Sequence, residues 1–274
     1  MNKEPQKEKI AIIGSGNVAG YMARSLFGSG HIIEIVYSRT LKNAQRLAEQ
    51  VSAGWTDKIE DIGPDAGVWI FALTDMATVE TVRKSGFMKA LLLHTAGSLP
   101  ADIFAGHATD YGVLYPLQTF SGNQDPGFKD IPICIESNTS RGLSRIRIMA
   151  ESISSSVREV NSEERSWLHA GAVFACNFAN HMYSLASDVL ARTGIPFEIF
   201  HPLILETARK AAEINPQEAQ TGPARRNDMI IIKKHMDLLS FSPELKSIYN
   251  QLTESIHVRS HIADDGVNKL QNQK

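Results

Sequence analysis

The sequence is poor in the features that mark several protein classes. It has two cysteines in 274 residues, too few for a disulfide framework or a cysteine-rich metal site. Its 28 basic and 30 acidic side chains nearly cancel, so no excess charge favours nucleic acid or an anionic membrane. No stretch approaches the roughly 20 apolar residues that a membrane-spanning helix needs. We therefore expect a cytoplasmic globular protein without a metal site, a nucleic-acid partner or membrane contact.

The pattern of apolar residues divides the chain into two parts. In the first part, short apolar runs alternate with helical patterns, as is typical of a doubly wound α/β fold with a parallel sheet. From residue 162 onward the strand signals stop and long helical periodicity takes over. We predict an α/β domain at residues 1–158 and an all-α domain at residues 159–274. The expected strands are 9–14, 32–37, 67–73, 90–94, 111–115 and 131–136, and the expected helices are 18–27, 41–51, 76–85, 163–193, 198–214, 228–239 and one that begins at 242. Because proline cannot donate to a sheet ladder, Pro132 favours an edge position for the last strand.

A glycine-rich turn follows the first predicted strand and opens the first predicted helix. Residues 14–19 read G-S-G-N-V-A, a G-x-G-x-x-A pattern whose weight comes from this strand-to-helix context. The first glycine permits a tight turn, and the second lets the backbone approach a pyrophosphate that the helix amide groups bind. A tight turn without a ligand is the alternative. We predict a Rossmann dinucleotide site contacted by Gly14, Ser15, Gly16, Asn17 and Val18.

The end of the second predicted strand distinguishes between the two nicotinamide cofactors. NAD enzymes usually place a carboxylate there for the ribose 2′-hydroxyl. Glu34 does not meet this requirement, because it lies inside the strand. The strand ends in Ser38, Arg39 and Thr40, and a guanidinium with two hydroxyls suits a 2′-phosphate. We therefore predict NADP(H) as the cofactor, the alternative being that Arg39 is only a solvated loop residue.

Four segments of the chain resemble one known family. They are the glycine loop with Tyr37-Ser38-Arg39-Thr40, HTAGS at 94–98, YPLQTF at 115–120, and TGP at 221–223 followed by Arg226 and Asp228. With the helical second half, they resemble a family of uncharacterised Rossmann-like oxidoreductases. That family is related to pyrroline-5-carboxylate reductase, prephenate dehydrogenase and deazaflavin-dependent NADP oxidoreductases. The resemblance spans roughly residues 9–256 and implies hydride transfer between NADP(H) and a small polar metabolite.

The resemblance also implies where the nicotinamide lies, between the carboxyl ends of the strands and the helical domain. Ligands of open α/β sheets generally bind outside the carboxyl ends of the strands. Asp75 has two possible roles: it contacts the cofactor, or it is an acid that caps or begins a helix. His94 is both a cofactor contact and a candidate proton donor, the alternative being a hydrogen-bonded histidine at a strand end. We therefore expect the cofactor to touch Ala72, Leu73, Thr74, His94 and Thr95.

The long helix offers polar groups but lacks the expected lysine. Related hydroxyacid dehydrogenases place a lysine four residues before an asparagine, whereas Val173 and Cys176 occupy those positions before Asn177 and Asn180. A proton donor is still required beside the reacting carbon. Two histidines 12 residues apart, His169 and His181, resemble the pair of prephenate dehydrogenases. On an ideal α-helix His169, Cys176 and Asn180 share one stripe, with Asn177 beside it and His181 at its margin.

These observations give a candidate site and leave two functions open. The catalytic candidates are His94, His169, Asn177 and Asn180, and the predicted substrate contacts are Gln118, His181 and Arg226. Packing or an interface is the alternative role for the histidines of the helix. The missing lysine keeps open a non-catalytic NADP(H)-binding protein with a redox-sensing or regulatory role. The resemblance and the apolar helices imply a homodimer formed through the helical domain, which would also bind the small-molecule substrate.

Overall fold

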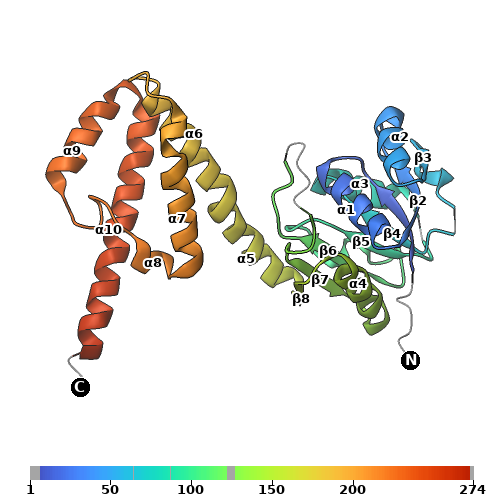
Figure 1. Cartoon of the computed structure of the whole chain (residues 1–274). Coiled ribbons are helices and arrows are strands. Elements are labelled where there is room, and N and C mark those ends of the chain that lie inside the picture. Colours follow the sequence, from blue (N-terminus) through green and yellow to red (C-terminus); the bar gives the residue numbers. More distant parts are fainter. Residues whose placement is uncertain (1–6, 64, 87, 122–126, 272–274) are drawn as a thin grey trace. The chain divides into compact units, whose positions relative to one another are not determined.

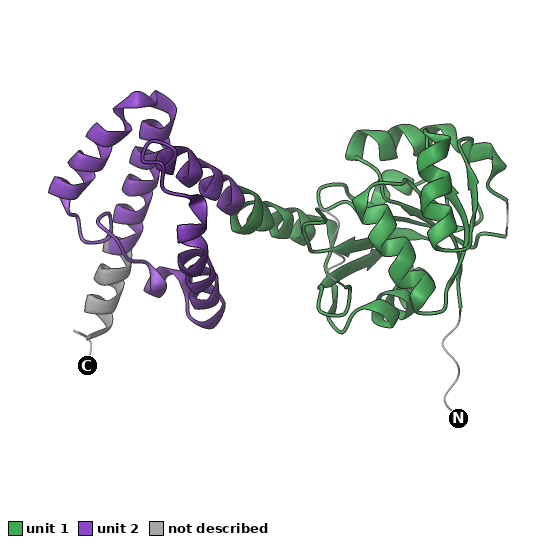
Figure 2. Ribbon diagram, turned by 45° about the horizontal axis from the view of Figure 1, so that its top comes forward, with its two compact units in different colours: residues 1–177 green, residues 178–274 purple. Residues whose placement is uncertain are grey.

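A computed structural model describes residues 7–63, 65–86, 88–121 and 127–271, with side chains up to residue 260. The chain forms two compact units, Met1–Asn177 and Phe178–Lys274 (Figure 2). The assignment of cofactor binding to residues 1–158 and of substrate binding to residues 159–274 stays a prediction.

The first unit is built around a β-sheet (Figure 1). The sheet has eight strands in the order β3-β2-β1-β4-β5-β6-β7-β8. Strand β7 runs antiparallel to β6, and all other neighbours are parallel. The predicted doubly wound Rossmann fold is confirmed, with one antiparallel step in the sheet. The strands are β1 (Lys9–Ile13), β2 (Ile32–Tyr37), β3 (Gly54–Thr56), β4 (Val68–Phe71), β5 (Leu91–His94), β6 (Tyr111–Pro116), β7 (Ile133–Ser137) and β8 (Val157–Glu159).

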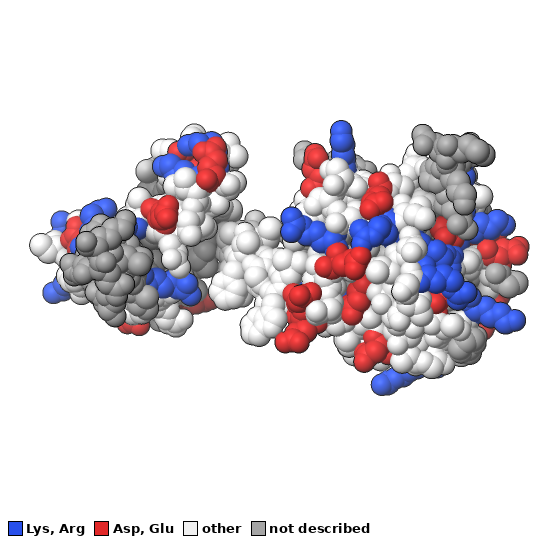
Figure 3. All heavy atoms as spheres, turned by 90° about the horizontal axis from the view of Figure 1, so that it is seen from below, with Lys and Arg blue, Asp and Glu red and all other residues white. Residues whose placement is uncertain are grey.

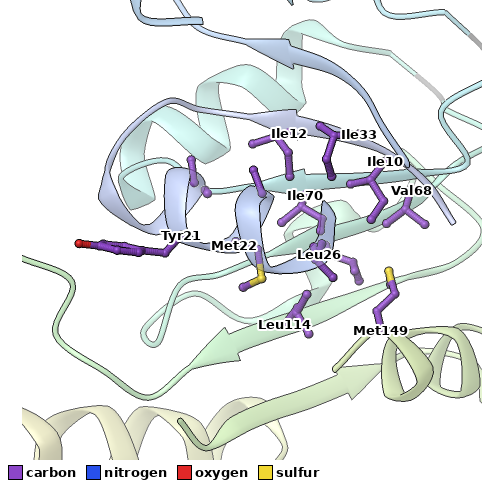
Figure 4. Packing of buried hydrophobic residues seen from close by; sticks show 14 of the residues in the cluster. Ile10, Ile12, Tyr21, Met22, Leu26, Ile33, Val68, Ile70, Leu114 and Met149 are labelled. Atoms are coloured by element: carbon purple, nitrogen blue, oxygen red, sulfur yellow. The ribbon is translucent and has the colours of Figure 1, made fainter. Parts of the chain in front are cut away.

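Both faces of the sheet are buried, which explains the nearly continuous apolar runs in the strands. Because side chains alternate along a strand, Ile10 and Ile12 join one core cluster, and Ala11 and Ile13 join the other. Figure 4 shows Ile10 and Ile12 in the first cluster, near Met22 and Leu26 of the first helix. Helices α1 (Asn17–Gly28), α2 (Leu41–Gln50) and α4 (Ser140–Ile153) contribute to this cluster, whereas α3 (Asp75–Lys84) and the 3-10 helices Ile59–Asp61 and Ala101–Phe104 contribute to the second.

Two details of the sheet differ from the prediction. The strand after Pro132 lies between β6 and β8, so its predicted edge position is wrong. Pro132 precedes β7 instead of interrupting it, and its missing N–H therefore removes no bond from the strand ladder. Helix α4 and the short outer strands β3 and β8 were not predicted, since three-residue strands carry little periodicity.

The long helix predicted for residues 163–193 is interrupted in its middle. It begins as α5 (Ser162–Ala172), continues as the π-helix Val173–Phe178 and resumes as α6 (Ala179–Leu190). A π-helix turns through a smaller angle per residue than an α-helix, because its bonds join residues five apart. The stripe that an ideal α-helix gives to Cys176, Asn177, Asn180 and His181 is therefore wrong.

The second unit is entirely helical in the part of the chain that the structure describes (Figure 2). The helices predicted for 198–214 and 228–239, and the one starting near residue 242, are all confirmed, and no strand falls within them. None of the helices in the described residues has the length and hydropathy of a membrane span. On the face shown in Figure 3, basic and acidic side chains are interspersed. The helices after α6 are the 3-10 helix Phe197–Phe200, α7 (His201–Glu213), α8 (Pro216–Ala219), α9 (Met229–Leu238), the 3-10 helix Leu239–Phe241 and α10 (Pro243–Gln271).

Candidate functional site

A cleft of about 510 Å³ lies at the carboxyl ends of β1, β2, β4 and β5 in the first unit. The parallel register brings these ends together, since Ile13 pairs with both Tyr37 and Phe71, and Phe71 pairs with His94. Asn43, Asp75, Ala77 and Ala96 add to its walls. Of the predicted cofactor residues, His94 is the one that does not line the cleft. Those that line it are Gly14, Ser15, Gly16, Asn17, Val18, Ser38, Arg39, Thr40, Ala72, Leu73, Thr74 and Thr95.

Gly14 forms the tight turn because no other residue fits there. Its φ angle is +128°, a conformation that L side chains rarely adopt. A Cβ atom on Gly14 would lie 2.3 Å from the carbonyl oxygen of Ala72, far inside contact distance. The Gly14 amide donates to the carbonyl of Tyr37 at 2.8 Å, which fixes the turn against β2.

The start of α1 has the properties of an anion site. Its N-cap, Gly16, provides no capping side chain, and the first turn contains no acidic residue. The amide groups of this turn and the positive end of the helix dipole are therefore uncompensated by side chains. A Cβ atom on Gly16 would meet nothing within 4 Å, so the absent side chain leaves open space in the cleft. This cradle fits a pyrophosphate group.

Hydroxyl and guanidinium groups lie at the end of β2. Ser15 Oγ donates to Ser38 Oγ at 2.8 Å, which ties the glycine loop to this strand end. Arg39 and Thr40 are exposed in the cleft wall, and Asn43 follows them in the first turn of α2. Sequence reasoning missed Asn43, although its position one turn after the strand end could have indicated it. These groups carry no negative charge and fit the 2′-phosphate of NADP(H).

Glu34 does not compete for this position. Its carboxylate lies 3.6 Å from the ammonium of Lys9, within the strand, and it is not part of the cleft lining. Among the described residues that line the cleft, the one carboxylate is that of Asp75 at the start of α3, away from Ser38, Arg39 and Thr40 in the sequence.

The loop after β5 is fixed by several hydrogen bonds. The Thr95 amide donates to the carbonyl of Phe71 at 3.1 Å, and the Ser98 hydroxyl donates to the Asp75 carboxylate. Asp75 is the first residue of α3, which Thr74 caps by accepting from the Ala77 amide at 3.4 Å. Asp75 thus lines the cleft as a first-turn acid and also braces the neighbouring loop.

His94 is fully buried and both of its ring nitrogens have partners. Nδ1 accepts from the Ala96 amide at 3.2 Å, so Nε2 carries the hydrogen and donates to the Pro100 carbonyl at 3.3 Å. Burial lowers the pKa of His94 to about 3, with a further contribution from the positive charge of Arg165. This geometry favours the alternative interpretation of His94, a hydrogen-bonded histidine at a strand end.

The buried neutral His94 predicts a loss of stability in mild acid. The unfolded chain protonates this histidine below about pH 6.5, whereas the folded protein does so only near pH 3. Between these values the free energy of unfolding should fall by about 1.4 kcal/mol per pH unit because of this group. In urea denaturation from pH 6.5 to 4, His94→Gln should show a shallower fall than the wild type.

A matched control for this slope is His107→Gln, since His107 is partly exposed and its ring lies 3.1 Å from the Gly86 carbonyl. Its variant should keep the wild-type slope. If His94→Gln also kept that slope, His94 would not be the group that resists protonation.

A tyrosine and a histidine meet beside this loop. Tyr115, near the end of β6, has its hydroxyl 3.1 Å from Nδ1 of His169 on α5. Gly97 packs against the same ring, because a Cβ atom there would lie 2.5 Å from His169 Nδ1. Sequence reasoning proposed His169 but missed Tyr115. Its place at the end of a strand parallel to β5 was the signal that could have indicated it.

The remaining predicted residues are exposed. Gln118 is outside the cleft lining, and its side-chain oxygen accepts from the Thr119 amide at 2.8 Å. Asn177 is in the π-helix at the end of the first unit. Asn180, His181 and Arg226 belong to the second unit, so their relation to the cleft stays a prediction.

Metal ligands do not gather in the described residues: no three or more His, Cys, Asp or Glu side chains there could hold an ion. Cys134 is buried and Cys176 is exposed, and both are free thiols.

Two family models match the chain. Residues 9–88 match the family described as NADP oxidoreductase, coenzyme F420-dependent, and residues 131–256 match a domain of unknown function. No curated protein matches the sequence.

Solved structures resemble the chain over nearly its whole length. One, from Bacteroides fragilis and described as a candidate NADP oxidoreductase, is 40% identical. That match covers 92% of this chain and 98% of the other, with a TM-score of 0.85. Pyrroline-5-carboxylate reductase from Streptococcus pyogenes is 17% identical, with coverage of 91% and 98% and a TM-score of 0.59. A reductive aminase from Aspergillus terreus in complex with NADPH is 17% identical, with coverage of 91% and 93% and a TM-score of 0.66. The last two similarities show a shared fold.

Proposed function

The chain belongs to the NADP oxidoreductase family represented by the Bacteroides fragilis structure, and from this premise we propose that it transfers a hydride between NADP(H) and a small polar metabolite. The observation that carries the proposal is the cleft, where an uncapped helix start and a strand end rich in hydroxyl and guanidinium groups face one space. The non-catalytic, regulatory alternative finds no support in the comparisons.

The residues of the cleft divide among the parts of the cofactor. The amide groups at the start of α1 would hold the pyrophosphate, and Gly16 would let it approach. Arg39, Thr40 and Asn43 would hold the 2′-phosphate. The segment 72–74 and Thr95 would border the nicotinamide, which supplies or accepts the hydride.

The roles around the substrate are also proposals. We retain His169 as the candidate for proton exchange and assign His94 to holding the loop after β5. Asn177 and Asn180 remain catalytic candidates, and Gln118, His181 and Arg226 remain candidate substrate contacts; the exposure of all five is compatible with these roles.

Titration of the protein with NADPH and NADH, followed by nicotinamide fluorescence, tests the proposal. NADPH should bind at least about tenfold more tightly, because a charge-assisted bond to the 2′-phosphate contributes about 1.5–3 kcal/mol. Arg39→Gln should remove most of this preference while binding of NADH stays unchanged. Lys42→Gln, a loss of charge in the exposed first turn of α2 and outside the cleft lining, is the matched control. Absence of binding for both cofactors would refute the proposed function.

The helical unit supports a homodimer. Helices α6 and α7 contain no buried residue, although a helix of this length depends on packing for its stability. Burial of these side chains against a second copy would provide the missing core. A monomeric mass in light scattering at micromolar concentration would contradict this. The large apolar side chains of the helical unit with more than half of their surface exposed are Ile199, Leu203, Leu205, Met229, Ile230, Leu238 and Val258.

We also place the protein in the cytoplasm, since the free thiols of Cys134 and Cys176 suit a reducing compartment.

A further inference from the structure

The pair formed by Tyr115 and His169 stands apart from the cofactor contacts and has its own chemistry. The phenol oxygen and Nδ1 are 3.1 Å apart, and the two rings meet edge to face with their centroids 6.0 Å apart. Tyr115 is 8% exposed, whereas His169 is only half-buried. One ring nitrogen of His169 is thus held from the protein side, while Nε2 has no hydrogen-bond partner among the described residues.

The imidazole adjoins the wall of the cleft. Thr95 and Ala96 line the cleft, and the next residue, Gly97, leaves no room for a side chain because the His169 ring occupies that space. The bond between Ser98 and Asp75 fixes the following residue of the same loop. The histidine is therefore placed against a braced loop whose preceding residues would border the nicotinamide.

We propose that His169 exchanges, through Nε2, the proton that accompanies hydride transfer, and that Tyr115 is the positioning residue that holds Nδ1. The inference rests on the proposed NADP(H) function. In the reducing direction, the hydride brings its electron pair to the carbon of a carbonyl or imine. The π electrons of that double bond move to oxygen or nitrogen, which takes the proton from Nε2. The Nε2–H bond breaks, the remaining ring proton stays on Nδ1, and solvent protonates Nε2 again.

The phenol suits this cycle because its oxygen accepts from Nδ1–H both before and after the proton leaves Nε2. The pKa of Tyr115 is raised, mainly by burial and further by Cys134. The positive charge of Arg165 acts in the opposite direction and lowers this pKa. Tyr115 therefore keeps its own proton and holds the ring without ionising. When a hydrogen-bond partner fixes the proton on Nδ1, the other ring nitrogen, Nε2, is left free to transfer a proton.

Other titratable groups close to the pair are already engaged. Arg165, one turn before His169, is paired with Glu136 of β7. Cys134 of β7 is buried, which raises its thiol pKa, so it stays neutral. His94 of β5 is neutral because its pKa is lowered to about 3. Among these groups, His169 combines a partner on one ring nitrogen with an Nε2 that is half-exposed and bonds to no described residue.

Nuclear magnetic resonance of the histidine rings tests the proposal without a substrate. The ring nitrogens of His169, assigned through His169→Gln, are followed against pH in the free protein and with NADP⁺ or NADPH. These cofactors differ at the nicotinamide, which is a cation only when oxidised. We expect NADP⁺ to shift the His169 titration to lower pH than NADPH does, by about half a pH unit or more, because like charges repel.

The tautomer of neutral His169 gives the second readout. In the wild type we expect the Nδ1–H form, and in Tyr115→Phe a change toward the Nε2–H form that free histidine prefers. Tyr111→Phe is the matched control, since Tyr111 lies at the start of β6 and Tyr115 lies near its end. This variant should leave His169 unchanged. The signal of His107, which lies outside the cleft lining, should not distinguish the two cofactors.

Each outcome has a definite meaning. If NADP⁺ and NADPH bind but shift His169 equally, the histidine is not beside the nicotinamide and the proposal fails while the function survives. If neither cofactor changes any signal, the proposed function itself fails. An Nε2–H tautomer that Tyr115→Phe does not alter would overturn the role of Tyr115.

Discussion

Replacement of Gly16 by valine should abolish NADPH binding while the protein stays folded. The backbone at Gly16, with φ −76° and ψ −174°, is accessible to any residue, and a Cβ atom there meets nothing within 4 Å. The glycine is thus not required by the fold. A valine would instead occupy the space in which the pyrophosphate reaches the amide groups of α1. We expect binding at least about 100-fold weaker, as loss of two charge-assisted hydrogen bonds implies.

Fluorescence titration with NADPH measures the loss, and thermal unfolding shows whether the fold is retained. Gly28→Ala is the matched control, because Gly28 is at the other end of α1 and its Cβ position is also open. It should leave NADPH binding unchanged. Wild-type affinity in Gly16→Val would mean that the pyrophosphate does not use the start of α1. Gly14→Val, by contrast, should destabilise the fold, because its Cβ would collide with the Ala72 carbonyl.

The walls of the cleft could be predicted because their signals are local. The glycine loop and the segment Ser38-Arg39-Thr40 each follow a strand directly, and parallel pairing brings the strand ends to one edge. The sequence alone thus indicates which residues face the same space. Asn43 was missed because it lies in the first turn of α2, beyond the motif at the strand end.

The pairing of Tyr115 with His169 could not be predicted in this way. The two residues are 54 positions apart, and their contact depends on the antiparallel pairing of β7 with β6 and on the path of α4 and α5. Neither the direction of β7 nor helix α4 was predicted. Local periodicity likewise gives no indication of the π-helix at Val173–Phe178, because the spacing of apolar residues does not distinguish bonds between residues five apart from bonds between residues four apart.

The buried guanidinium of Arg165 anchors the helix that carries His169, and its removal should cost more stability than any surface charge. Its side chain is 1% exposed, and it donates to the Glu136 carboxylate and to the Leu99 carbonyl. The Ser162 hydroxyl lies 2.9 and 2.8 Å from the two carboxylate oxygens of Glu136, which share its one hydrogen. These contacts join α5 to β7 and to the loop after β5. Nε of Arg165 donates to no group among the described residues, so one hydrogen bond of the buried guanidinium is left unmade there.

Arg165→Leu should lower the free energy of unfolding by about 3–5 kcal/mol, because it leaves the Glu136 carboxylate partly buried without a counter-charge. The double variant Arg165→Leu with Glu136→Leu should recover much of this loss, since it leaves neither charge unpaired. Arg209→Leu is the matched control: Arg209 forms ion pairs with Glu206 and Glu213 on the surface of α7, where solvent screens them, and its loss should be hardly measurable. Chemical denaturation gives all three values. If Arg165→Leu were as stable as Arg209→Leu, burial would not make the Arg165 pair essential, and the position of α5 would depend on apolar packing alone.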